Sequence, residues 1–225
     1  MNVKAAERQT TRVPSTAAQH ALEGLRLALV EGDLRPGDRV GQEQIAARLG
    51  VSLAPVREAL AVLEQEGQVT YLPRRGYFVA QLALDEMREI YQLRALLEER
   101  AARQTLPLLD RDAVARIKLA AEECASAVAA GDVAAELEAN RRFHFGVLSS
   151  PGQVHTLRLI RLLWDSTETY RALYYNSAQG REESLAAHER ILAAIGAGDA
   201  DRLIAALAAH RESALRRIAA ILEPR

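Results

Sequence analysis

The 225-residue chain has 49% hydrophobic residues, and its 29 Lys and Arg nearly balance 30 Asp and Glu, for a formal net charge of −1. This balance excludes a disordered polyanion and provides no overall basic charge to attract nucleic acid, so DNA binding has to be argued from a motif. The single cysteine excludes an intrachain disulfide framework, and the lack of a signal-peptide pattern or a long apolar run predicts a cytoplasmic protein.

The N-terminal third of the sequence predicts a small domain over residues 16–81, after a flexible tail over 1–15. Apolar residues at helical spacing, with glycines at the helix ends, place helices from about Thr16 to Gly32, over Gln42–Leu49, and from Ser52 to just before Gly67. Two short β-prone segments, Val69–Leu72 and Tyr77–Ala80, flank the turn residues Pro73–Gly76. Three helices followed by a hairpin is the order of elements in a winged helix-turn-helix.

After Gln81 the pattern changes to long amphipathic helices, which predicts an all-helical bundle over residues 85–222 and a mainly α fold for the chain. The expected helices are Asp85–Gln104, Asp110–Ala130, Asp132–Ser149, Val154–Asn176, Glu182–Ile195 and Asp199–Leu222. Gly131-Asp132 and Gly198-Asp199 each place a helix-ending glycine before an N-cap aspartate, which is typical of a tight corner between helices.

The segment around Gly50 has the spacing of a helix-turn-helix, because the glycine permits a sharp turn and Val51 can fill the space between the two helices. The recognition helix would present Ser52, Leu53, Ala54 and Arg57 to the major groove. On the hairpin, Arg74, Arg75 and Gly76 would reach the DNA backbone or the minor groove. The alternative is a winged helix that binds protein and whose arginines are only solvated.

The stretch GVSLAPVREALAVLEQEGQV, with LRPGDRV before it and Pro73 and Gly76 after it, resembles the recognition segment and wing of the GntR family of bacterial regulators. The resemblance covers about residues 16–80 and implies binding to double-stranded operator DNA. At the positions of Leu53 and Ala54 the family usually has an arginine and a threonine that touch DNA. Two polar contacts are therefore replaced here, and methyl contact with thymine is expected to substitute in part.

Three of the five histidines fall on the apolar stripes of separate predicted helices: His144, His188 and His210. Asn140 precedes His144 by four residues, so the two side chains share a helix face. Burying several imidazoles without a shared partner is costly, so the pattern favours a metal site over hydrogen-bonded core histidines. Imidazoles with an oxygen ligand suit zinc, nickel or another divalent ion and leave positions open for water or an effector carboxylate.

This second constellation resembles the FCD effector domain of FadR-type GntR regulators. In that domain an aspartate and three histidines hold a divalent metal inside a helical barrel that binds small organic acids. Asn140 stands where the family has the aspartate. A neutral amide oxygen is a weaker ligand than a carboxylate, so the resemblance implies a site that holds its ion less tightly.

Arg94 lies in the middle of an apolar stripe, with Glu98 four residues later. A buried arginine needs a partner, and two interpretations stay open: an internal ion pair with Glu98, or a bidentate clamp on a ligand carboxylate. Arg94 also matches an arginine in the first helix of the FCD domain. Tyr91 and Trp164 are expected to line the cavity or the core, and Cys124 is expected to be a core residue, not a reactive thiol.

Together these features predict a homodimeric, ligand-responsive transcriptional regulator, expected to be a repressor, whose two winged helices bind the half-sites of an operator. A small carboxylate-bearing metabolite would contact Arg94 and any metal held by the histidines, and would change the placement of the DNA-binding domains. Two alternatives are a metal-dependent hydrolase that uses the three-histidine site and a pure metal sensor. No general base is evident beside the histidines, so enzymatic activity is not expected.

Overall fold

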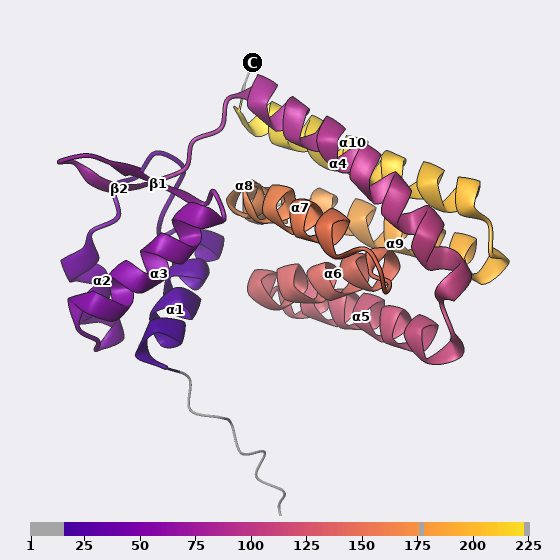
Figure 1. Ribbon diagram of the computed structural model, residues 1–225, viewed down its shortest axis with the longest axis horizontal. Coiled ribbons are helices and arrows are strands. Elements are labelled where there is room, and N and C mark those ends of the chain that lie inside the picture. The colour runs from indigo at the N-terminus through magenta and orange to yellow at the C-terminus, as the bar shows by residue number, and fades with distance from the viewer. Residues whose placement is uncertain (1–15, 176–177, 223–225) are drawn as a thin grey trace, which may run out of the picture.

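A computed structural model describes residues 16–175 and 178–222, which form two domains joined by residues 80–83 (Figure 1). The predicted flexible tail over 1–15 lies outside these ranges. No helix within them combines the length and the low polarity that crossing a lipid bilayer requires.

The N-terminal domain has the predicted three helices and hairpin: α1 Ala17–Glu31, α2 Gln42–Leu49, α3 Leu53–Gln65, β1 Val69–Leu72 and β2 Gly76–Val79. The strands are antiparallel, with Val69 opposite Val79, and an isolated bridge between Arg39 and Phe78 extends the small sheet. The turn between α2 and α3 begins at Gly50, whose φ of +67° is a left-handed conformation that glycine adopts without strain. The apolar faces of α1, α3 and the hairpin meet in one core, which includes Leu25, Leu60 and Leu63.

The C-terminal domain is all helical, as predicted. Its elements are α4 Leu84–Thr105, a short 3₁₀ helix η1 Leu106–Leu108, α5 Arg111–Ala130, α6 Val133–Leu148, α7 Val154–Asp165, α8 Glu168–Tyr175, α9 Ala178–Ala197 and α10 Ala200–Leu222. The predicted corner at Gly131-Asp132 is present: Gly131 has a φ of +71°, and the Asp132 carboxylate accepts a hydrogen bond from the N–H of Ala135 at 2.9 Å. Helix α9 is longer at both ends than the predicted Glu182–Ile195.

The prediction of one continuous helix over Val154–Asn176 is wrong, because the chain breaks into α7 and α8, and Asn176 itself is not described. At the break, the Thr167 hydroxyl and Arg171 Nη1 donate to the carbonyl oxygen of Trp164 at 3.1 and 2.6 Å. The N–H of Thr167 also donates to this carbonyl, at 3.3 Å, so side chains supplement a short turn bond where a continuing α-helix would use the N–H of residue 168. We call the turn formed by residues 164–168 the elbow.

The two domains share an apolar cluster that includes the first half of α8. Val30 of α1 belongs to the same buried cluster as Met87 and Tyr170 of the C-terminal domain. The Tyr170 hydroxyl also accepts a hydrogen bond from the linker N–H of Leu82 at 2.7 Å. Figure 1 shows α8 at the side of the bundle that faces the N-terminal domain, where it contacts α1. The elbow and α8 are therefore a direct connection between the domains.

Candidate functional site

The start of α3 presents three of its four predicted DNA-contact residues to solvent. Ser52, Ala54 and Arg57 are exposed, whereas Leu53 is half-buried and packs against the core of the N-terminal domain. Arg57 Nε donates to Gln42 Oε1 at 3.2 Å, so the guanidinium lies against the first turn of α2. The surface is a polar groove between α2, α3 and the hairpin. Its lining includes Leu53 and Arg57, together with Arg39, Gln42 and Gly76.

The hairpin tip carries the predicted basic pair. Arg74 has a φ of +64°, which is uncommon for a residue with a side chain, and Gly76 follows at +92°. The turn is held by the N–H of Arg75, which donates to the Leu72 carbonyl at 3.0 Å, and by Arg39 Nε, which donates to the Arg75 carbonyl at 3.1 Å. Arg74 and Arg75 are exposed. The wing thus holds two cations beside the groove at the start of α3.

The three predicted histidines meet inside the C-terminal domain. His144 comes from α6, His188 from α9 and His210 from α10, and all three are buried. One ring nitrogen from each can be chosen so that the three atoms lie within 4.8 Å of one another. The rings of His144 and His210 are stacked, with centroids 5.0 Å apart. Residues 66 positions apart in the sequence thus form one cluster.

The fourth predicted ligand, Asn140, lies beside this cluster, with Oδ1 3.1 Å from His188 Nε2. Within the described part of the chain, His144 Nε2 and His188 Nδ1 are buried and have no hydrogen-bond partner. Buried polar atoms normally have a partner, so two such nitrogens in one cluster fit a site completed by a bound cation. The donor set, three imidazoles and an amide oxygen, suits zinc or nickel.

The histidines are held in the neutral form that binds metals. Burial, reinforced by the neighbouring histidines and by Arg94, lowers the pKa of His144 well below 6.5. Burial and His210 lower the pKa of His188 in the same way. The pKa of His210 falls to about 4, because burial and Arg94 outweigh the opposing effect of Glu98. All three imidazoles therefore have their lone pairs available near neutral pH.

An ion-pair triad lies next to the histidines. Glu98 Oε1 accepts from Arg94 Nε at 2.8 Å and Glu98 Oε2 accepts from Arg211 Nη1 at 2.7 Å, with all three side chains buried. Burial acts to raise the pKa of Glu98, but the two guanidinium groups outweigh it and hold the pKa below 4.5. Glu98 is therefore a carboxylate, and one negative charge is shared by two positive ones.

Trp164 forms the wall between two of the buried cations. The guanidinium carbon of Arg94 lies 4.2 Å from the centre of the Trp164 ring, and that of Arg171 lies 4.5 Å from it. Both arginines line a cavity of about 20 Å³, roughly the space of one water molecule. The same cavity is lined by Tyr91, Asn140, His210, Arg211 and Ala214.

Arg171 and Arg211 belong to this cavity but were missed by sequence reasoning. A signal existed for each: Arg171 is seven residues after Trp164, which places both on one helix face if the helix continues, and Arg211 follows His210 on the buried side of α10.

Cys124 is buried near the Glu136 carbonyl, and burial raises the pKa of its thiol to about 12. That thiol is in its unreactive form, as expected for a core residue.

Comparison with known families assigns both domains. Residues 17–79 match the family of bacterial regulatory proteins called gntR, and residues 89–213 match the FCD domain. The Nta operon transcriptional regulator of Aminobacter aminovorans is 30% identical over 78% of this chain and 82% of the relative. The HTH-type transcriptional regulator BphR of Paraburkholderia xenovorans is 31% identical over 85% of this chain and 80% of the relative.

Solved structures share the fold. The chain superposes on Escherichia coli McbR/YncC with a TM-score of 0.79 at 23% identity, over 93% of this chain and 100% of the other. A GntR regulator from Rhodococcus sp. RHA1 gives a TM-score of 0.75 at 23% identity, over 91% and 98% of the two chains. These likenesses support the arrangement of one winged helix followed by one helical bundle.

Proposed function

The chain is a transcriptional regulator of the GntR family with an FCD effector domain, and on this premise we propose that it senses a small organic acid beside Trp164, where the cavity of about 20 Å³ would widen to admit the ligand. The observation that carries the proposal is the charge at this cavity. Arg94, Arg171 and Arg211 supply three guanidinium groups, and Glu98 supplies one carboxylate. Such an excess of buried positive charge favours an anionic ligand, and a planar carboxylate matches the guanidinium donors.

A bound divalent metal fits the same site. His144, His188 and His210 would be its nitrogen ligands, and Asn140 would offer an amide oxygen. When bound, the ion would add positive charge and an open coordination position for a ligand oxygen. The imidazoles remain neutral, which leaves their lone pairs available to the ion. Glu98 keeps the Arg94 guanidinium oriented toward Trp164. The acid, with or without metal, is the proposed effector.

For DNA binding we propose a homodimer that contacts two operator half-sites, because one small domain makes too few contacts for operator-level affinity. The C-terminal domain has an apolar face suited to this role on the neighbouring helices α4 and α7. Four leucines there are exposed by 43–70%: Leu93, Leu96, Leu159 and Leu162. A second copy that covers this face would bury the leucines of both chains.

A pure metal sensor is the second candidate, favoured by the three convergent histidines. A hydrolase has no such support, because both matched families and the relatives named above are transcriptional regulators.

We propose repression as the mode of action, with the effector releasing the operator. In a metal sensor the ion alone would change operator affinity, whereas in an acid sensor the acid would be required.

A thermal-shift screen tests the proposal. Mono-, di- and tricarboxylic acids are added to protein that is loaded with Zn²⁺ or treated with a chelator. We expect at least one acid to raise Tm, and the shift to be lost in Arg94→Ala but kept in Arg88→Ala, whose guanidinium is exposed on the same helix. A shift that is equal in both variants would contradict binding at the Trp164 cavity.

A further inference from the structure

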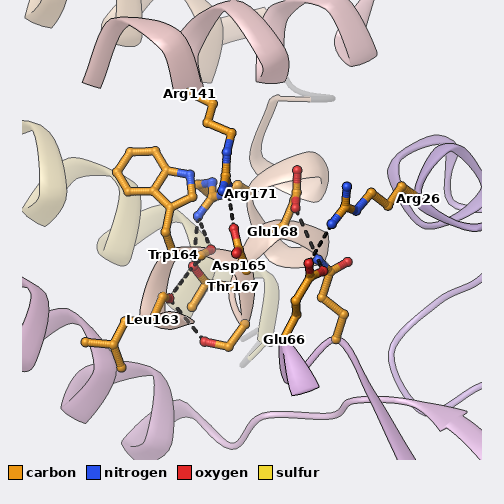
Figure 2. Close-up of polar contacts among 11 residues, drawn as sticks. Arg26, Glu66, Arg141, Leu163, Trp164, Asp165, Thr167, Glu168 and Arg171 are labelled. Atoms are coloured by element: carbon orange, nitrogen blue, oxygen red, sulfur yellow. Dashed lines mark hydrogen bonds and ion pairs between the residues drawn. The ribbon is translucent and has the colours of Figure 1, made fainter. Parts of the chain in front are cut away.

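The elbow touches the DNA-binding domain at the end of the recognition helix. Gln68, in the turn between α3 and β1, is buried and donates through Nε2 to Glu168 Oε2 at 3.3 Å and to Glu66 Oε2 at 3.0 Å. Glu66 in turn accepts from Arg26 of α1 at 2.6 Å. Figure 2 shows Glu66, Arg26 and Glu168 gathered at this contact.

Backbone packing makes the same contact tight. Gly67 has a φ of +73°, and a Cβ built on it would lie 3.2 Å from Ser166 Cβ in the elbow. A displacement of the elbow toward the DNA-binding domain would therefore push Ser166 against the backbone of Gly67. Gly67 lies two residues after the end of α3 at Gln65, so the position of the elbow and the end of the recognition helix depend on each other.

The other side of the elbow is fixed by an arginine of the effector cavity. Arg171 Nη1 donates both to the Trp164 carbonyl at 2.6 Å and to the Thr167 hydroxyl at 2.9 Å (Figure 2). The same guanidinium lies over the Trp164 ring and lines the cavity. A second arginine, Arg141, binds Asp165 from α6. The elbow is thus held by cations on the cavity side and by Gln68 on the DNA-binding side.

From these contacts we infer that the elbow transmits the state of the effector cavity to the recognition helix, with Arg171 as the residue that couples them. An anion in the cavity would compete with the Trp164 carbonyl and the Thr167 hydroxyl for the Arg171 donors. The elbow then loses hydrogen bonds that keep α7 and α8 separate, and its contacts with Gly67 and Gln68 change. This inference rests on the proposed function, because it presumes both an anionic effector and operator binding.

A double-mutant cycle tests the coupling without knowledge of the effector. Operator affinity is measured with a labelled duplex that carries the DNA directly upstream of the protein's own gene. The variants are Arg171→Lys, which loses the forked donor geometry, Glu168→Ala, which removes the elbow's acceptor of Gln68 and leaves Glu66 as the other acceptor, and the double variant. Thr167→Val provides a second way to weaken the elbow with Arg171 intact. Glu123→Ala, which removes a half-exposed ion-paired carboxylate on α5, is the matched control.

We expect Arg171→Lys and Thr167→Val each to change the Kd for the duplex about fivefold or more, and Arg171→Lys to have a much smaller effect when Glu168 is already alanine. Glu123→Ala should leave the Kd unchanged. Far-UV circular dichroism confirms that each variant is folded. If the effects of positions 171 and 168 multiply independently, or if Arg171→Lys and Thr167→Val in folded protein do not change the Kd, the elbow inference is overturned. If the wild type does not bind the duplex, the proposed function fails first, and the inference loses its basis.

Discussion

Arg94 and Glu98, one helical turn apart on α4, form a buried ion pair with Nε 2.8 Å from Oε1. The sequence left open whether Arg94 is an internal ion-pair partner or part of a ligand site. The geometry joins the two interpretations, because the paired guanidinium also lies over Trp164 at the cavity wall. Pairing with Glu98 orients Arg94 toward the cavity and does not withdraw it.

Removal of the shared carboxylate should destabilise the C-terminal domain strongly. Glu98→Gln leaves Arg94 and Arg211 buried without their anionic partner, and we expect a loss of about 3–5 kcal/mol in the free energy of unfolding. Urea unfolding followed by circular dichroism measures this. The matched control is Glu99→Gln, which breaks only a half-exposed pair with Arg103 and should cost about 1 kcal/mol or less. Similar losses in both variants would show that the buried triad has no special role.

The metal affinity of the histidine cluster should depend on residue 140. Asn140→Asp replaces an amide oxygen with a carboxylate beside His188, so we expect Zn²⁺ to bind about tenfold tighter or more. Competition with a chromophoric chelator gives the Kd. His188→Ala removes a ligand and should weaken binding in the same assay. If neither substitution alters the Zn²⁺ affinity, the ion binds elsewhere.

The fold was largely predictable from the sequence, because each helix buries one stripe and most of the corners carry a glycine or a capping aspartate. The elbow was not. The sequence from Asp165 to Tyr170 is compatible with a helix, and the break depends on Arg171 reaching back to the Trp164 carbonyl. Local periodicity does not report such a contact.

The candidate site was predictable in part. Stripe positions indicate that His144, His188 and His210 point inward, but only the packing of α6, α9 and α10 shows that they meet. Arg171 and Arg211 went unnoticed, although both lie on buried faces, because arginine is usually a surface residue. The net charge at this cavity comes from side chains on α4, α8 and α10, so it becomes visible only when these helices are packed together.

The apolar face on α4 and α7 should hold the dimer together. Leu96 is 70% exposed in the single chain, so Leu96→Glu should place a charge in the interface and give a monomer. Sedimentation velocity measures the mass. Leu108→Glu changes a leucine of η1 that is 61% exposed and away from this face, and should remain dimeric. A wild-type protein that sediments as a monomer at micromolar concentration would contradict the homodimer.

Stability should depend on pH through Glu136 on α6. Burial raises the pKa of this carboxyl to about 7, and Oε2 has no hydrogen-bond partner among the residues described. Between its usual pKa of 4.5 and about 7, the folded state keeps a proton that the unfolded chain has released, so stability falls as pH rises through this window. Glu136→Gln is neutral at every pH and should be more stable than wild type at pH 8, by about 1–3 kcal/mol. The difference should vanish near pH 4.5, and equal Tm values at pH 8 would argue against the raised pKa.

The central claim is that occupancy of the Trp164 cavity controls operator binding, and one titration measures both. Trp164 is the only tryptophan in the chain, so its emission reports the cavity, while the anisotropy of a labelled upstream duplex reports DNA binding. We expect an organic acid identified by thermal shift to change Trp164 emission and to release the duplex over the same concentration range. Arg94→Ala should lose both responses, and Arg57→Ala should weaken duplex binding while the emission change persists. Saturation of the Trp164 signal with no change in anisotropy would contradict the claim.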